Sequence, residues 1–186
     1  MNELDTRRTR LREFSHADAS ELLAVFRNRG IRRFLLDDLV VGSEWIKEEI
    51  GESIARFSRG CAGLWSVRLD RDGPIVGFVG YRDFFDPPEL QLLYGLLPLY
   101  WGRGLATEVS ARVCEYGFDV LGFEEIRAAI DAPNHASRAV LERLGFSETH
   151  RRDKANQGTA FFCLGRDDRV AEINWPDGPA STHPAK

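Results

Sequence analysis

The alternation of apolar and polar side chains divides the first half of the chain into strands and helices. Residues 9–14 alternate with the strand period, and a helix with an apolar stripe is expected to begin near Ser15. A second helix is expected from Ser43 to Phe57. Residues 62–69 and 75–82 have strand character and are joined by a short polar turn that contains a glycine, which predicts a β-hairpin.

The second half continues with a strongly apolar segment, residues 89–97, that ends at Pro98. Proline has no N–H group for a strand ladder, so the strand is expected to stop there. The remaining pattern predicts helices at residues 104–121 and 136–144, and strands at residues 126–131, 146–152 and 159–165. Helices interspersed with strands predict a layered fold of the α/β (α+β) class.

Length and composition are those of a folded domain. The chain has 186 residues, of which 43% are hydrophobic, and this is enough to bury a sizeable core. We expect a single domain at residues 9–168. Residues 169–186 are expected to form a partly disordered tail, because prolines and small polar residues dominate the end of the chain.

Charge and cysteine content exclude several classes of protein. The formal net charge is −4 without a basic run, so we expect no nucleic-acid partner. The N-terminus is charged and no apolar run approaches about 20 residues, so neither a signal peptide nor a membrane span is expected. Cys61, Cys114 and Cys163 lie far apart in the sequence, which argues against a disulfide framework or a metal site and favours a cytoplasmic protein.

The most informative segment is the turn between residue 98 and the helix at 104–121. Gly102 and Gly104 let the backbone bend and approach an anion without a Cβ clash, and Ala106 keeps that approach open. The N-terminus of the following helix offers unpaired N–H groups and the positive end of a dipole. The turn is therefore a candidate pyrophosphate site, although a tight strand-to-helix connection would look the same.

Two other nucleotide motifs fit less well. A P-loop requires Gly-Lys followed by Ser or Thr, which this turn lacks. A dinucleotide-binding fingerprint requires an acidic residue at the end of the next strand, whereas Glu124 and Glu125 precede that strand. An enzyme that uses a nucleotide at the same turn is thus a minor alternative.

Two motifs stand at a fixed place in the order of elements. The first is PLYWGRGLAT, from Pro98 to Thr107, and the second is Asn134 and Ser137 followed by Leu144-Gly145-Phe146. Together with the order of elements, they resemble the GNAT acetyltransferase superfamily, in particular its RimJ/RimL-type branch. The resemblance covers roughly residues 9–165 and implies a mixed, mostly antiparallel sheet of about six to seven strands, flanked by about four helices.

The resemblance also implies an N-acetyltransferase that uses acetyl-CoA as its donor and a primary amine as its acceptor. Turn amides would hold the pyrophosphate, strand backbone would pair with the pantetheine arm, and the second motif would contact the other side of the cofactor. The implied cofactor-binding residues are Leu96, Leu97, Trp101, Gly102, Arg103, Gly104, Leu105, Ala106, Thr107, Asn134 and Ser137. Asn134 as a simple cap or turn residue, and Ser137 as a first-turn helix residue, are the structural alternatives. A monomer or homodimer is expected.

The catalytic groups depart from the family pattern. Many members carry a Tyr acid seven residues after the Asn, where this chain has Leu141. Gln91 stands where the branch often has Glu, and Gln cannot take a proton. Glu89 lies two residues earlier on the same strand face and is the candidate base, or simply an exposed strand-end carboxylate. The candidate catalytic residues are Glu89, Gln91 and Asn134; Tyr94 and His135 are more easily explained as a core residue and a solvated turn residue.

The acceptor is expected to enter beside the first two helices and the loop at residues 83–88. Candidate lining residues there are Trp45, Phe84 and Phe85, each of which would also fit in the core. A cationic acceptor would favour acidic side chains there, such as Asp37 and Glu89. The missing Tyr and Glu also leave open a second function, a module that binds acyl-CoA without chemistry.

Overall fold

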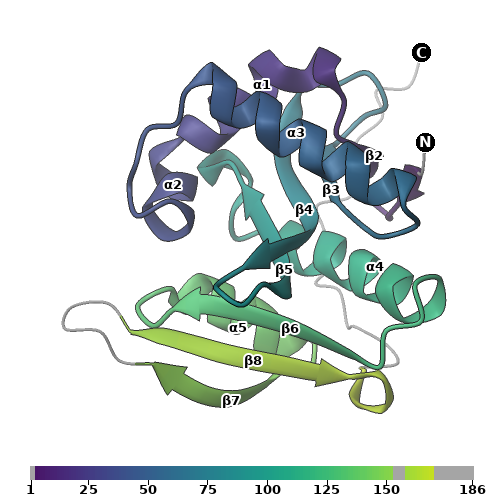
Figure 1. The fold of residues 1–186 in the computed structure, drawn as a ribbon, viewed down its shortest axis with the longest axis vertical. Helices are drawn as coiled ribbons and strands as arrows, with labels where there is room; N and C mark the ends of the chain where they lie inside the picture. Colours follow the sequence, from purple (N-terminus) through teal and green to yellow (C-terminus); the bar gives the residue numbers. More distant parts are fainter. Residues whose placement is uncertain (1–2, 153–157, 170–186) are drawn as a thin grey trace, which may run out of the picture.

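The computed structural model describes residues 3–152 and 158–169. One sheet carries eight strands in the order β1-β2-β3-β4-β5-β6-β8-β7 (Figure 1). The strands are β1 (Glu3–Asp5), β2 (Arg10–Glu13), β3 (Leu64–Arg68), β4 (Ile75–Phe84), β5 (Glu89–Leu96), β6 (Glu125–Asp131), β7 (Ser147–Arg152) and β8 (Thr159–Gly165). The α-helices are α1 (Ala19–Arg27), α2 (Arg29–Leu35), α3 (Ser43–Ser58), α4 (Leu105–Asp119) and α5 (His135–Arg143).

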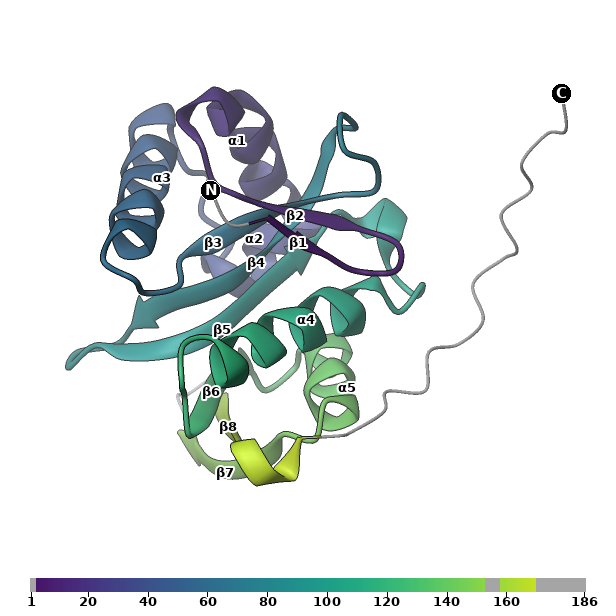
Figure 2. The ribbon, with the colours of Figure 1, turned by 90° about the vertical axis from the view of Figure 1, so that its right-hand side faces the viewer.

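Helices cover both faces of the sheet. Figure 2 shows α1, α2 and α3 on one side of the strands and α4 and α5 on the other. On the first side, Leu22 and Phe26 of α1 pack with Ile46 and Ile50 of α3 against Phe78 of β4. Burial of such side chains is the main force that fixes these helices on the sheet.

The second side holds the larger core. Val109 and Val113 of α4 and Leu141 of α5 are fully buried there against strand residues such as Val79 and Leu164. The helical spacing of the apolar residues in α4 therefore matches the face that this helix buries.

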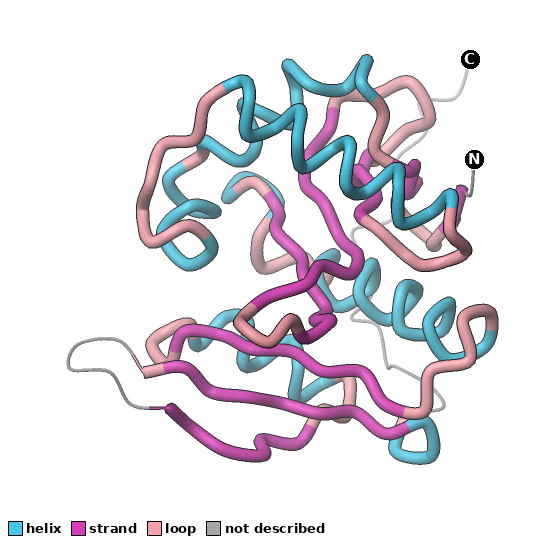
Figure 3. Tube along the Cα trace, in the orientation of Figure 1, coloured by secondary structure: helices cyan, strands magenta, loops and turns pink. Residues whose placement is uncertain are grey.

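The sheet is split at its centre. Every neighbouring pair from β1 to β5 is antiparallel, and so are the pairs β6–β8 and β7–β8. Strands β5 and β6 are parallel and pair only where Gln91 lies opposite Arg127. The two strands then diverge, so the backbone of β5 beyond Gln91 has an edge without a partner strand (Figure 3).

The predicted fold class is confirmed, with a sheet that is larger than expected. The described residues form eight strands, where about six to seven were predicted, and five α-helices, where about four were predicted. The extra strand, β1, has only three residues and pairs with β2, so the sheet begins at Glu3 and not at residue 9. The predicted tail at residues 169–186 lies outside the described residues except for Arg169.

In the described part of the chain, none of the helices is both long and apolar enough to cross a membrane.

Candidate active site

A cleft of about 990 Å³ opens where β5 and β6 diverge. Its walls come from α2, β5, the turn before α4, β6 and the start of α5. The cleft passes through the sheet, since it is lined by Leu93, which packs with the α1–α3 core, and by Leu92, which packs with the α4 core. Two molecules that approach from opposite faces of the sheet can therefore meet in it.

The glycine turn forms one end of the cleft. Gly102 and Gly104 both have a left-handed backbone, with φ of 71° and 73°, which glycine adopts without strain. Gly104 caps α4, and the first helical hydrogen bond runs from Glu108 N to Gly104 O at 3.1 Å. The amides of the first helical turn, Leu105 to Thr107, thus lack a partner within the helix. A Cβ on Gly102 would meet nothing within 4 Å, so the approach to these amides is open and the turn fits an anion such as a pyrophosphate.

A buried carboxylate fastens this turn to the N-terminal hairpin. Glu108 is 4% exposed, and its oxygens accept hydrogen bonds from Arg8 Nε (2.6 Å), Arg8 N (2.8 Å) and Thr6 Oγ1 (2.6 Å). Arg8 Nη1 also donates to Arg103 O at 2.8 Å. Neither Arg8 nor Glu108 was singled out from the sequence, because their contact joins segments about a hundred residues apart.

The side chain of Trp101 is hydrogen-bonded to the backbone at the end of β5. The indole Nε1 of Trp101 donates to Leu96 O at 2.6 Å, on the edge of β5 that faces the cleft. Leu97 N instead donates to Val76 O of β4 at 2.9 Å. Leu96 and Trp101 line the cleft, whereas Leu97 and Arg103 are not among its lining residues. Arg103 lies with its guanidinium 5.8 Å from the Tyr100 ring centroid.

The opposite wall is the N-terminus of α5. Asn134 is its N-cap, and Asn134 Oδ1 accepts a hydrogen bond from Ser137 N at 3.1 Å. Both residues also line the cleft, so the capping alternative is correct without excluding a contact with a ligand. His135 is exposed, as predicted, but it is the first residue of α5 and not a turn residue. Leu141 is fully buried in the core and is not available for chemistry.

Tyr94 is a lining residue that the sequence placed only in the core. Its hydroxyl donates to Ser137 O at 3.1 Å, which ties β5 to α5 across the cleft. Burial raises the pKa of Tyr94, and the hydrogen bond with Ser137 offsets part of that rise. Its position on the strand face opposite to Gln91 was predictable from strand alternation, but its contact with α5 was not.

Gln91 lies at the closed end of the cleft, where β5 and β6 pair, and Glu89 contacts Gln91 there without being a lining residue itself. Gln91 is 2% exposed and lines the cleft, and its Nε2 donates to Glu89 Oε2 at 3.2 Å. Glu89 is half-buried and lies 3.7 Å from Arg127 Nη1. The two residues share a strand face, as expected, and are in direct contact.

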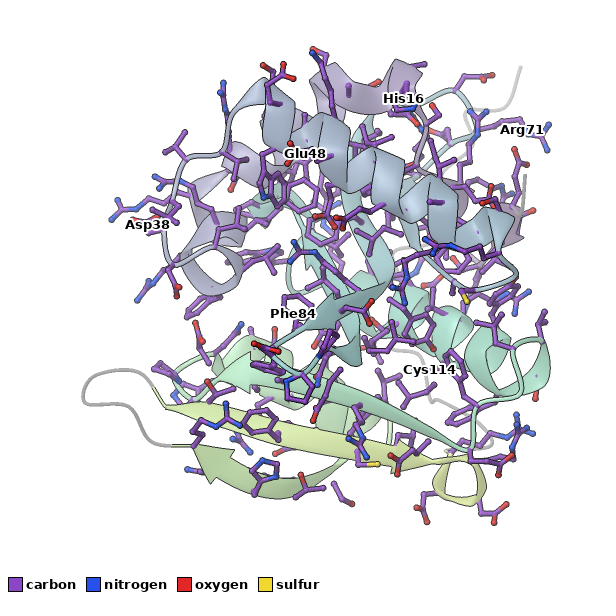
Figure 4. All side chains as sticks on the ribbon, viewed as in Figure 1. His16, Asp38, Glu48, Arg71, Phe84 and Cys114 are labelled. Atoms are coloured by element: carbon purple, nitrogen blue, oxygen red, sulfur yellow. The ribbon has the colours of Figure 1, made fainter. Side chains whose placement is uncertain are left out.

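Aromatic and acidic side chains line another part of the cleft. Phe84 and Phe85 line it, and Figure 4 places Phe84 between the α3 half of the molecule and the strands β6 and β8. Asp37 after α2 and Asp131 at the end of β6 also line the cleft. Burial raises the pKa of Asp131, and the nearby Asp37 carboxylate raises it further.

Trp45 is not among the lining residues. It packs against the Phe26 ring, 5.2 Å between centroids, and lies 5.8 Å from the Arg82 guanidinium. Arg82 pairs with the buried Glu49 at 2.9 Å. Burial raises the pKa of Glu49, and the Arg82 charge lowers it in part.

Comparison with known proteins agrees with this architecture. The sequence model of one protein family, described as the acetyltransferase (GNAT) domain, matches residues 8–147 of this chain. A relative in Bacillus subtilis (strain 168), the uncharacterized N-acetyltransferase YoaA, is 26% identical over 146 residues, which is 78% of this chain and 82% of YoaA. The chain therefore belongs to the GNAT acetyltransferase domain family and is an N-acetyltransferase.

Solved structures show the same fold. A ribosomal-protein-S5-alanine acetyltransferase from Vibrio fischeri superposes with a TM-score of 0.74 at 19% identity, over 91% of this chain and all of that one (100%). RimL, a ribosomal L7/L12 α-N-protein acetyltransferase solved in complex with coenzyme A, superposes with a TM-score of 0.76 at 13% identity, over 90% and 99% of the two chains. These superpositions show that the chain shares their fold.

Proposed function

We propose that the protein transfers an acetyl group from acetyl-CoA to a primary amine, by direct attack within a ternary complex. The observation that carries the proposal is the cleft between β5 and β6, which joins a helix N-terminus on one face of the sheet to an aromatic and acidic mouth on the other. The acceptor class is a protein N-terminus or a small-molecule amine.

The donor fits the residues present. The amides from Leu105 to Thr107, which have no partner within the helix, would hold the pyrophosphate, with Gly102 leaving the approach open and Gly104 beginning the helix in a left-handed conformation. The edge of β5 that has no partner strand would hydrogen-bond the amide groups of the pantetheine arm in the way that an added strand does; at its end, Leu96 O already accepts a hydrogen bond from Trp101 Nε1. Asn134 and Ser137 would contact the arm from α5. Bound in this way, acetyl-CoA supplies an activated acetyl group.

The chain's contribution to chemistry is mainly placement. The amine nitrogen forms a bond with the acetyl carbon as the C–S bond breaks, and the electron pair of that bond leaves with sulfur. The nitrogen loses one proton and the thiolate gains one, so the products are an N-acetylated amine and free CoA. Holding both reactants in one cleft replaces a bimolecular encounter with a local one, which supplies a large part of such catalysis.

Two measurements test the proposal. Acetyl-CoA is expected to raise the melting temperature of the protein, because a ligand that binds only the folded state stabilises it. Free thiol release is then followed with spermidine, n-butylamine and short peptides that start with Ala or Ser. Stabilisation by acetyl-CoA without thiol release from any acceptor would favour the alternative, an acyl-CoA-binding module. Stabilisation by NAD or ATP but not by CoA would contradict the proposal altogether.

A further inference from the structure

The amide of Gln91 has one partnered and one unpartnered end. Its Nε2 donates to Glu89 Oε2 at 3.2 Å. Its Oε1 is buried and has no hydrogen-bond partner among the described residues. Since the side chain is only 2% exposed and lines the cleft, this oxygen is a buried acceptor at the place where a substrate would lie. A buried carbonyl oxygen without a donor destabilises the protein, and a donor supplied by a ligand would relieve this.

Glu89 determines which end of the amide is left without a partner. A carboxylate can only accept hydrogen bonds, so the NH₂ group of Gln91 must face Glu89 and the oxygen must face away. The reversed amide would set the Gln91 oxygen against a carboxylate oxygen. Glu89 is itself paired with Arg127 Nη1 at 3.7 Å, and Arg127 is the residue opposite Gln91 in the single β5–β6 pairing. The orientation of the amide is therefore held by a chain of contacts across the closed end of the cleft.

The closed end is also where the reacting group of the donor would lie. A donor anchored at the glycine turn would run along the free edge of β5, from Leu96 back toward Leu92. Gln91 is the next residue, on the strand face that carries the acceptor side of the cleft with Phe84 and Leu93. An acceptor that entered past Phe84 would thus bring its nucleophile between Gln91 and the end of the donor.

We propose that Gln91 Oε1 accepts a hydrogen bond from the amine nitrogen of the acceptor, and that Glu89 is a positioning residue that orients the Gln91 amide. This inference rests on the proposed function and adds a rule for which acceptors react. The attacking nitrogen directs its lone pair at the acetyl carbon and must still carry at least one N–H to donate to Gln91. The bond strengthens as positive charge develops on nitrogen, so it favours the reacting state over the bound amine. Gln91 takes no proton itself; the proton that the nitrogen loses goes to solvent, and the thiolate is protonated from solvent.

The test compares variants by steady-state kinetics with the best acceptor of the amine panel. Gln91→Met keeps the side-chain volume but removes the acceptor oxygen. We expect kcat/KM for the acceptor to fall about tenfold, the effect of one lost hydrogen bond to a partly charged group, with the KM for acetyl-CoA unchanged. Gln91→Glu is a second variant at the same position: it keeps an acceptor oxygen but sets a carboxyl group against Glu89 Oε2, so the two groups are expected to share a proton. Because one oxygen of this pair can still accept a hydrogen bond, Gln91→Glu is expected to lose less of kcat/KM for the acceptor than Gln91→Met.

Glu89 is tested through a double-mutant cycle. If it acts only by orienting Gln91, then Glu89→Ala lowers kcat/KM for the acceptor in the wild-type background and has no further effect in the Gln91→Met background. Additive losses would show that Glu89 has its own role, for example as a base, and would overturn the positioning assignment. An unchanged acceptor kcat/KM in Gln91→Met, or a change confined to the KM for acetyl-CoA, would overturn the role of Gln91.

A binding measurement separates this inference from the proposed function. In the CoA-saturated protein, titration with n-butylamine is expected to shift the NMR signals of the Gln91 side-chain NH₂ group, and Gln91→Met is expected to weaken n-butylamine binding. A wild-type protein that acetylates nothing would contradict the proposed function. Absence of any shift at Gln91, in a protein that does acetylate amines, would contradict the inference alone.

Discussion

Replacing Glu108 with Gln tests how the phosphate turn is held in place. The carboxylate accepts three hydrogen bonds, from Arg8 Nε, Arg8 N and Thr6 Oγ1, at 2.6, 2.8 and 2.6 Å. Gln has nearly the same shape but presents one NH₂ group, which would face a donor from Arg8 or Thr6. The Arg8 guanidinium would lose its charged partner while its Nη1 still contacts Arg103 O in the turn.

The expected cost follows from the burial of the pair. Breaking a fully buried ion pair costs about 3–5 kcal/mol, and the 25% exposure of the Arg8 side chain reduces that figure through solvent screening. We expect a loss of about 2 kcal/mol in the free energy of unfolding, which would lower the urea midpoint by about 1 M for an m-value of about 2 kcal/mol/M. Because the hairpin supports the turn, affinity for acetyl-CoA is expected to fall as well.

Glu115→Gln is the matched control. Glu115 lies on the same helix and pairs with Arg112 at 3.3 Å, but this pair is exposed, so its loss is expected to cost less than about 0.5 kcal/mol. Equal urea midpoints for Glu108→Gln and Glu115→Gln would refute the claim that Glu108 holds the turn to the N-terminal hairpin.

Three other predictions concern the turn, the wall of the cleft and pH. Gly104→Ala is expected to cost about 1–2 kcal/mol, because the residue has a φ of 73°, and to weaken acetyl-CoA binding in calorimetry; unchanged affinity would contradict the role of the turn. Gly30→Ala is expected to destabilise the protein by about 1–3 kcal/mol, because the new Cβ would lie 2.7 Å from Pro98 Cγ. The control is Gly51→Ala in α3, whose Cβ would meet nothing within 4 Å and which is expected to stabilise the protein by about 0.5–1 kcal/mol. Equal melting temperatures for the two variants would refute the packing of Gly30 against Pro98. Burial raises the pKa of Glu49 above the ordinary 4.5, so the folded protein binds more protons than the unfolded chain between the two values, and stability falls as pH rises through that window. Urea unfolding as a function of pH is expected to show a shallower fall in Glu49→Gln, and identical slopes would contradict the raised pKa.

Much of the fold was predictable because its signals are local. The apolar periodicity of α4 and of β5, and the glycine turn between them, depend on residues adjacent in the sequence. Strand β1 was not predictable, because Glu3–Asp5 is too short to show alternation and contributes only Leu4 to the core. The split in the sheet depends on the meeting of β5 and β6 at Gln91 and Arg127, a contact between distant segments that no local pattern carries.

The sequence predicted which residues belong to the candidate site better than it predicted the contacts between them. The strand alternation placed Glu89 and Gln91 on one face, but not the hydrogen bond that joins them or the free Gln91 oxygen. The capping signal of Asn134 was local and is confirmed. The contact of Tyr94 with Ser137 depends on the tertiary packing of α5 against β5, and so lay beyond the sequence pattern.

Transfer of an acetyl group to an amine is the central claim, and a coupled measurement tests it most directly. The wild-type protein is incubated with acetyl-CoA and each amine of the panel, and released thiol and acetylated amine are quantified together. We predict that at least one primary amine gives equal amounts of both products, and that Gly104→Ala lowers the rate. Failure of every amine to release thiol, together with no stabilisation of the protein by acetyl-CoA, would contradict the account.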